Sequence, residues 1–322
     1  MPHRQPSSPS ASRRRLPGWV LGLCLGWASA GPLPFELRLL AHEGPEHEIE
    51  ELTALLKARG DSPDLLIERA IEYGVLGKYT EAIHDLERAL QLDPNSIHAF
   101  RELGRLQSLN GKTDDAIATV SRALRLGIEE PIDRGGLLIL RAELLRSKDR
   151  DRRALEDCQA AIGLHPRNPE WYLLRSDLQR RLKLHKDRIA GLEAGLTETG
   201  AGVLAIERIE ALLDAKEFAI ALKAIEPELD SSRLKEAWLV RRGRARLGLG
   251  DRKGGEEDLR AALAEIGTLL NPARPDATLL LDQATALVLL GDLAGARQAY
   301  QLAKDKGGAP DLTRRIQALL PP

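Results

Sequence analysis

The sequence is poor in cysteine, in aromatic side chains and in any excess of one charge. It holds two cysteines, Cys24 and Cys158, and Cys24 lies in an N-terminal segment that we expect to be removed. The single remaining cysteine excludes an intrachain disulfide. Aromatic residues make up 3% of the chain. The formal charge is −1, or −5 without the four arginines of residues 1–30, which excludes a polybasic nucleic-acid binder.

The sequence also lacks strand-like alternation and a membrane-spanning run. No stretch alternates apolar and polar residues convincingly, and no apolar run after residue 30 is long enough to cross a bilayer. Ala, Leu, Arg and Glu dominate the chain after residue 46, and these residues favour helices. The composition therefore predicts an all-α protein.

Residues 1–30 have the pattern of a secretory signal peptide. The basic run Arg13–Arg15 precedes the apolar run Leu16–Trp27, and Ala28-Ser29-Ala30 supplies small residues for cleavage. We expect cleavage near Ala30 and export of the mature chain, to the periplasm or outside the cell. An uncleaved anchor is an alternative, although the apolar run is short. A lipid anchor at Cys24 is another, although Leu23 before it is large.

The segment Leu65–Asn95, LLIERAIEYGVLGKYTEAIHDLERALQLDPN, reads as two short helices joined by a turn. Small residues stand where the two helices must cross closely, with Ala70 on the first helix and Ala82 and Ala89 on the second. Pro94 closes the unit, because proline cannot continue a helix. This spacing resembles the tetratricopeptide repeat (TPR) family.

The small residues recur at the TPR period. Ala82 and Ala116 are 34 residues apart, and so are Ala89 and Ala123. The resemblance implies a right-handed α-α superhelix, a TPR solenoid of about seven helix-turn-helix repeats with capping helices. The predicted segments are a signal peptide at 1–30, a lead-in and N-terminal capping helix at 31–62, repeats 1–3 at 63–168, degenerate repeats 4–5 at 169–235, repeats 6–7 at 236–310 and a C-terminal cap at 311–322.

Two positions depart from the pattern in the degenerate repeats. Arg188 stands where a small residue belongs, which predicts that the helices separate or shift there. Pro227 is expected to cut the second helix of repeat five short. A hinge near repeats four and five is left open.

The resemblance also implies a function. TPR proteins are typically non-catalytic scaffolds that bind a peptide or a helix in a concave groove lined by the first helix of each repeat. We therefore expect no enzyme activity and no cofactor. The groove-facing arginines implied by the resemblance are Arg101, Arg105, Arg146, Arg180, Arg181, Arg241 and Arg244. The acidic groove positions are Glu68, Glu102, Glu143, Asp177 and Asp282.

Arginines outnumber acids among these positions, although the mature chain is acidic. Because the planar guanidinium donates two parallel hydrogen bonds to a carboxylate, the sequence predicts an acidic peptide or protein partner. The alternative is that these side chains simply form a solvent-exposed, charged helix face and bind no partner.

One short cluster resembles a metal site. His42 and His47, with Glu43 and Glu46 between them, carry ligand types that Zn²⁺ accepts. Gly44-Pro45 interrupts any helix there, so the two histidines lack the helical spacing of a zinc protease. A metal-assisted hydrolase or accessory factor using this segment is an alternative. A structural tether in a cell-envelope assembly is another alternative.

Overall fold

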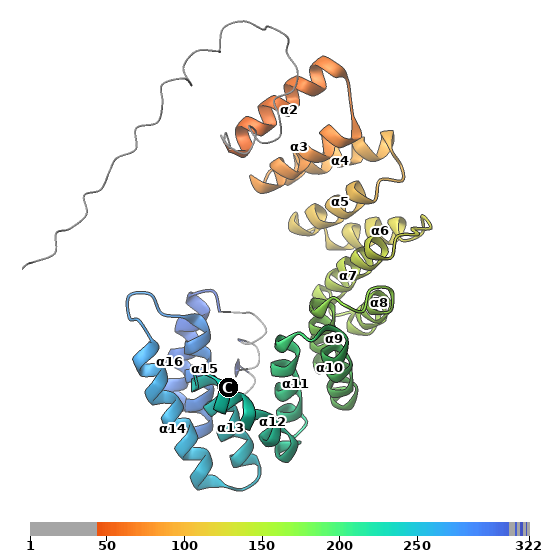
Figure 1. Ribbon diagram of the computed structural model, residues 1–322. Helices are drawn as coiled ribbons and strands as arrows, with labels where there is room; N and C mark the ends of the chain where they lie inside the picture. The colour runs from red at the N-terminus through yellow and green to blue at the C-terminus, as the bar shows by residue number, and fades with distance from the viewer. Residues whose placement is uncertain (1–43, 309–312, 314–315, 318–319, 321–322) are drawn as a thin grey trace, which may run out of the picture. The chain divides into compact units, whose positions relative to one another are not determined.

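The structure is a computed structural model that describes residues 44–308 and, beyond them, residues 313, 316, 317 and 320. This part of the chain holds fifteen α-helices and no strand (Figure 1). The all-α solenoid predicted from the sequence is confirmed. The predicted signal peptide and most of the predicted C-terminal cap lie outside the described residues. No described helix combines the length and the hydropathy that crossing a bilayer would require.

The helices form a cap and seven antiparallel pairs. Helix α2 (Pro45–Arg59) packs against the first helix of the first pair. The first helices of the pairs are α3 (Pro63–Val75), α5 (Ile97–Leu109), α7 (Pro131–Ser147), α9 (Pro169–Arg181), α11 (Gly202–Asp214), α13 (Glu236–Gly248) and α15 (Ala277–Leu290). The second helices are α4 (Tyr79–Leu92), α6 (Thr113–Ala123), α8 (Asp151–Leu164), α10 (His185–Thr199), α12 (Phe218–Ser231), α14 (Arg252–Leu269) and α16 (Leu293–Asp305).

Small side chains lie where the two helices of a pair cross. Ala70 on α3 and Ala82 on α4 are fully buried, as the sequence predicted. On α13 even a methyl group is too large, because a Cβ added to Gly243 would lie 2.8 Å from Leu259 and 3.0 Å from the Gly255 carbonyl. The pairs are therefore held together by close packing that tolerates little added volume.

The turn between the helices of a pair has the same backbone form in all seven repeats. One residue with positive φ, between 55° and 88°, follows the first helix. Glycine adopts this left-handed conformation without steric cost, and the turn keeps it even where another residue is present. The seven residues are Gly77, Gly111, Asp149, Lys183, Lys216, Gly250 and Gly291.

A charged fork joins the two helices in three of the repeats. An arginine on the first helix donates two hydrogen bonds to an aspartate that follows it by 16 residues on the second helix, at 2.6–3.0 Å. The aspartates are nearly buried, so the bidentate geometry satisfies both of their oxygens. The pairs are Arg69 with Asp85, Arg141 with Asp157 and Arg242 with Asp258.

Arg188 is fully buried in repeat four, and its guanidinium points to the next repeat. It donates to Ser176 on α9 at 2.9 Å, to Glu207 on α11 at 2.6 Å and to Asp214 on α11 at 2.8 Å. Ser176, itself buried on α9, accepts the bond from Arg188 and donates its own hydroxyl to Glu207 at 3.0 Å. A buried ion network therefore links repeats four and five.

The expected early end of α12 at Pro227 is wrong. The helix continues to Ser231 with Pro227 inside it. Pro227 is exposed, so the backbone carbonyl that loses its hydrogen bond to the proline lies on the solvent side of the helix. Buried Ile225 and Leu229, on either side of the proline, anchor the same helix face in the core and offset the lost bond.

The buried apolar side chains of the described residues gather into three clusters. The first extends from Leu56 to Ala211, and the second extends from Ile209 to Ala286. The third joins α15 and α16 to Ile316. The first two clusters meet within α11, the helix that also provides Glu207 and Asp214 as partners of Arg188.

The close crossing at Gly243 makes a testable prediction about stability. Gly243→Ala forces the α13–α14 contact apart, and we expect the free energy of unfolding to fall by about 1–3 kcal/mol. Gly267→Ala is the matched control, because its added Cβ meets nothing within 4 Å inside α14. We expect this second substitution to raise the free energy of unfolding by about 0.4–1 kcal/mol. Urea denaturation followed by circular dichroism measures both. Equal effects of one sign would contradict the packing described.

Candidate functional site

The first helices of successive repeats pack beside one another. Such contacts join α3 to α5, α5 to α7, α9 to α11, α11 to α13 and α13 to α15. Their solvent-facing side chains form what we call the first-helix face. All seven arginines predicted from the sequence belong to these helices, at α5, α7, α9 and α13.

The two arginines of α5 are the most exposed of the seven. Arg101 and Arg105 have side chains that are 48% and 45% exposed. Both lie near the carboxylate of Glu102, at 3.7 Å and 2.9 Å. Ion pairs this open to water contribute little to stability, so both guanidinium groups are able to exchange this partner for another.

The three arginines at the ends of α7 and α9 are held by aspartates. Arg146 donates to Asp177 at 2.9 Å, and Arg180 donates to the other oxygen of the same carboxylate. Burial works to raise the pKa of Asp177, but Arg180 and Arg146 hold it below its usual value. Arg181 contacts Asp149 at 2.7 Å and Asp151 at 2.8 Å. These guanidinium groups therefore already carry carboxylate partners within the chain.

Arg241 and Arg244 on α13 are held by α11. Arg241 donates to Glu210 at 2.7 Å and to its own helix at the Ala237 carbonyl at 3.1 Å, and its guanidinium lies over the Trp238 ring at 5.2 Å. Arg244 donates to Glu210 at 3.4 Å and to Asp214 at 2.8 Å. Asp214 also accepts from Arg188, so one network extends from repeat four to α13.

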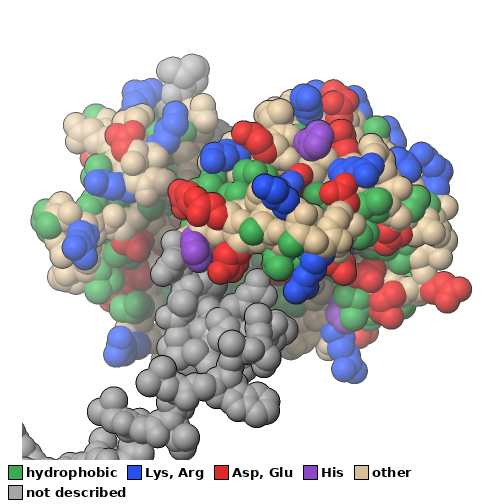
Figure 2. Space-filling view, turned by 90° about the horizontal axis from the view of Figure 1, so that it is seen from above, with side chains coloured by type: hydrophobic (Ala, Val, Ile, Leu, Met, Phe, Trp, Pro, Cys, Tyr) green, Lys and Arg blue, Asp and Glu red, His purple; other side chains and the backbone are tan. Residues whose placement is uncertain are grey.

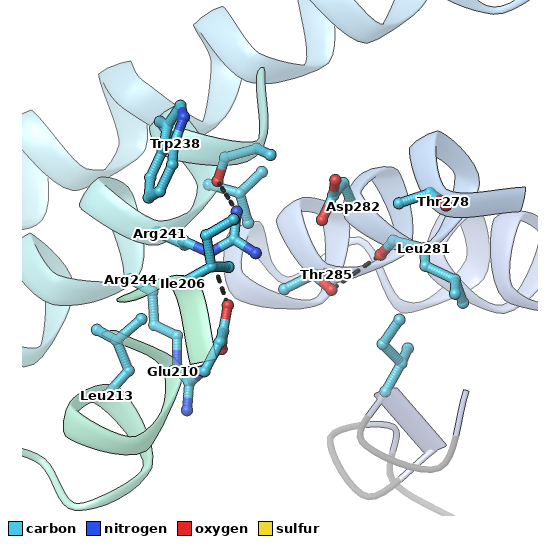
Figure 3. Close-up of a pocket in the computed structure, with 13 residues that line it drawn as sticks. Ile206, Glu210, Leu213, Trp238, Arg241, Arg244, Thr278, Leu281, Asp282 and Thr285 are labelled. Carbon is cyan, nitrogen blue, oxygen red and sulfur yellow. Dashed lines mark hydrogen bonds and ion pairs between the residues drawn. The ribbon is translucent and has the colours of Figure 1, made fainter. Parts of the chain in front are cut away.

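A cavity of about 290 Å³ opens between α11, α13 and α15, with Ile316 as a further wall (Figure 3). We call it the groove pocket. Leu213, Val240 and Leu281 make part of it apolar, and the paired Arg241 and Glu210 lie on one side. Its full lining is Ile206, Glu210, Leu213, Ala237, Trp238, Val240, Arg241, Arg244, Thr278, Leu281, Asp282, Thr285 and Ile316.

Asp282 lies in the wall of the groove pocket that α15 provides, across from Arg241 (Figure 3). It forms no hydrogen bond or ion pair with any other residue that the structure describes. Burial raises the pKa of Asp282 to about 6; Arg241 opposes the rise, and Glu210, Glu236 and Asp276 add to it. Among the described residues, the pocket therefore presents a carboxyl group without a partner of its own.

Glu236, at the start of α13, is a second acid of this region. It is 6% exposed, and its Oε2 atom is buried without a hydrogen-bond partner among the described residues. On the face of the molecule shown in Figure 2, Lys and Arg are interspersed with Asp and Glu, so the described part of this surface has no large patch of one charge.

The histidine segment and Cys158 are the remaining positions considered from the sequence. His47 lies 3.4 Å from Glu51 on α2, whereas His42 lies outside the described residues. Within the described ranges no three His, Cys, Asp or Glu side chains are grouped to hold a metal ion. Cys158 is fully buried, and burial raises its thiol pKa to about 12, which is unsuited to a nucleophile.

Similar proteins agree with the fold. Two family models, both described as tetratricopeptide repeat, match residues 76–127 and 240–310. A tetratricopeptide repeat protein from Parabacteroides merdae has a TM-score of 0.58 at 16% identity, covering 80% of this chain and 98% of that chain. The C-terminal part of a TPR repeat-containing protein from Cytophaga hutchinsonii has a TM-score of 0.55 at 14% identity, covering 80% of this chain and 100% of that chain.

Two curated relatives match over a shorter stretch. Protein SGT1 homolog of Homo sapiens is 31% identical over 110 residues, which is 34% of this chain and 30% of that protein. The Bos taurus homolog is 33% identical over 84 residues, which is 24% of this chain and 25% of that protein. The chain thus spans less than a third of either relative.

The matched family, the helical solenoid and these relatives support a general role in protein interaction, and TPR proteins are generally non-catalytic. The buried small residues that hold the helix pairs together, and the two family models that match residues 76–127 and 240–310, lead to one conclusion: this is a chain built with tetratricopeptide repeats.

Proposed function

We propose that the protein binds a peptide or protein partner on its first-helix face, with the groove pocket as an anchor site. The observation that carries this proposal is the pocket itself. It combines apolar walls with a few polar groups, as ligand sites generally do. It also includes Trp238 and two arginines, and these residue types are enriched where interfaces gain most of their energy.

The arginine side chains of the groove pocket are fixed by contacts within the chain before any partner binds. Arg241 has three contacts, with Glu210, with the Ala237 carbonyl and with the Trp238 ring. Arg244 bridges Glu210 and Asp214. Side chains that are already ordered lose little conformational freedom on binding, so more of the contact energy remains as affinity.

Blocking the groove pocket tests this proposal. Thr278→Trp places a large ring at an exposed position in the pocket wall. We expect it to weaken capture of the partner from the native source about tenfold or more, measured by affinity pull-down with quantitative mass spectrometry. Lys253→Trp on α14, exposed and outside the pocket lining, is the control and should capture the partner normally. Undiminished capture by the Thr278→Trp protein would refute the pocket as the anchor.

The acidic part of the partner that the sequence predicts is proposed to bind at α5. Arg101 and Arg105 are best placed to contact it, because their side chains are more exposed than those of the other five arginines. We expect the double substitution Arg101→Glu and Arg105→Glu to weaken binding of the captured partner about tenfold, and added salt to weaken binding to the native protein. Isothermal calorimetry measures both. Unchanged affinity would remove the acidic partner from this helix.

Export of the chain, with cleavage near Ala30, is proposed from residues 1–30. The basic run, the apolar run and the small residues at the cleavage site support it. Intact-mass spectrometry of the protein from its native source is expected to give a chain beginning at Gly31. A chain that begins at Cys24 with added lipid mass would instead favour the tether, and an intact N-terminus would contradict cleavage.

A further inference from the structure

We propose that the groove pocket receives a basic side chain of the partner, lysine or arginine, whose cationic group contacts the carboxylate of Asp282. This inference rests on the proposed function, because it names the chemistry of the anchor that occupies the pocket. It concerns one side chain of the partner and not the partner's overall charge.

The first argument is the distribution of ion pairs around the pocket. Both cationic groups of the lining are already committed, since Arg241 and Arg244 each donate to Glu210 and Arg244 also donates to Asp214. Asp282 occupies the position on α15 that Arg241 occupies on α13, two residues before the buried small residue. Arg241 nevertheless turns to Glu210, and Asp282 is left without a partner among the described residues.

The second argument is the field at Asp282. Glu210 and Glu236 act on it from α11 and α13, and Asp276 acts on it from the start of its own helix. Arg241 is the only base among the charges that act on it appreciably within the described residues, and it is paired with Glu210. With Arg241 and Glu210 neutralising each other, the acids Glu236 and Asp276 remain, and they favour a cation beside Asp282 and oppose a second carboxylate.

The third argument is the shape of the pocket. At about 290 Å³ it lies at the small end of the ligand-site range, which suits a single side chain better than a whole cofactor. Val240, Leu281 and Ile316 offer apolar surface for the methylene stem of lysine or arginine. The Thr285 hydroxyl donates to the Leu281 carbonyl, so its remaining lone pairs are able to accept from an ammonium or guanidinium group.

Binding of a cation to Asp282 requires the ionised carboxylate. Because its pKa is about 6 in the free protein, Asp282 is charged at pH 7.5 and mostly protonated at pH 5. The groups that face it are Arg241 and Glu236 on α13, Glu210 on α11 and Asp276 at the N-cap of α15. Affinity for a basic side chain should therefore fall as the pH drops through 6, and this fall should disappear when residue 282 cannot ionise.

A random-peptide display library is the probe. The full chain, its Asp282→Asn variant and its Glu257→Gln variant are each used for selection at pH 7.5. Glu257 is exposed on α14 outside the pocket lining, so its variant matches the charge change of Asp282→Asn without touching the pocket. We expect the native chain and the Glu257→Gln variant to enrich one lysine or arginine position, and the Asp282→Asn variant to select peptides without that preference.

A selected peptide then gives the affinity change directly. Replacing its basic residue with norleucine, or Asp282 with Asn, should each raise the Kd about tenfold or more, and both together should do little further harm. A shift from pH 7.5 to pH 5 should raise the Kd of the native chain about tenfold and leave that of the Asp282→Asn variant nearly unchanged.

The outcomes separate this inference from the proposed function. Peptides that bind, lose affinity with Thr278→Trp and show no basic preference would overturn the cationic anchor and keep the pocket. Two outcomes would contradict the groove pocket as an anchor and, with it, the cationic anchor at Asp282. One is selected peptides whose affinity Thr278→Trp does not change, and the other is failure of every library to give a peptide. An acidic preference that Asp282→Asn strengthens would reverse the assigned charge.

Discussion

The close crossing of two helices in each repeat is the constraint on which the other features depend. Ala70 faces the crossing with α4, and Gly243 faces the crossing with α14 with no room for a Cβ. At this separation an arginine on one helix donates two hydrogen bonds to the carboxylate of an aspartate on the other, as Arg69 does to Asp85. The same crossings fix each first helix against the next, and so they determine which side chains share the first-helix face.

The groove pocket lies beside the place where this constraint is relaxed. Arg188 replaces the small residue, and its guanidinium is satisfied by α9 and α11. Asp214 then passes the network to Arg244, which lines the pocket. The apolar core also divides within α11. At the junction of repeats four and five, hydrogen-bonded ion pairs stand where small residues pack in other repeats. Departures from a repeat pattern are commonly found at functional sites.

The sequence predicted what depends on a fixed interval and missed what depends on three-dimensional volume. Small residues 34 apart were enough for the helix pairs and for the buried positions of Ala82 and Ala116. The early helix end predicted at Pro227 was wrong because the sequence does not show that the missing hydrogen bond falls on the solvent side of α12. The groove pocket was not predicted, because its walls come from three helices and from Ile316, whose meeting no spacing encodes.

The arginines of the first helices were predicted as a basic surface, and their pairing shows why a count of charges is insufficient. Arg241 finds Glu210 31 residues earlier, and Arg146 finds Asp177 31 residues later, which is nearly one repeat in each case. A search for acids at this interval would have found both partners in the sequence. Because paired charges cancel, the net charge of a site depends on the charged groups that have no partner. Among the described residues of the groove pocket, the group left without a partner is the carboxyl group of Asp282, and therefore the chemistry of the anchor can differ from that of the surface around it.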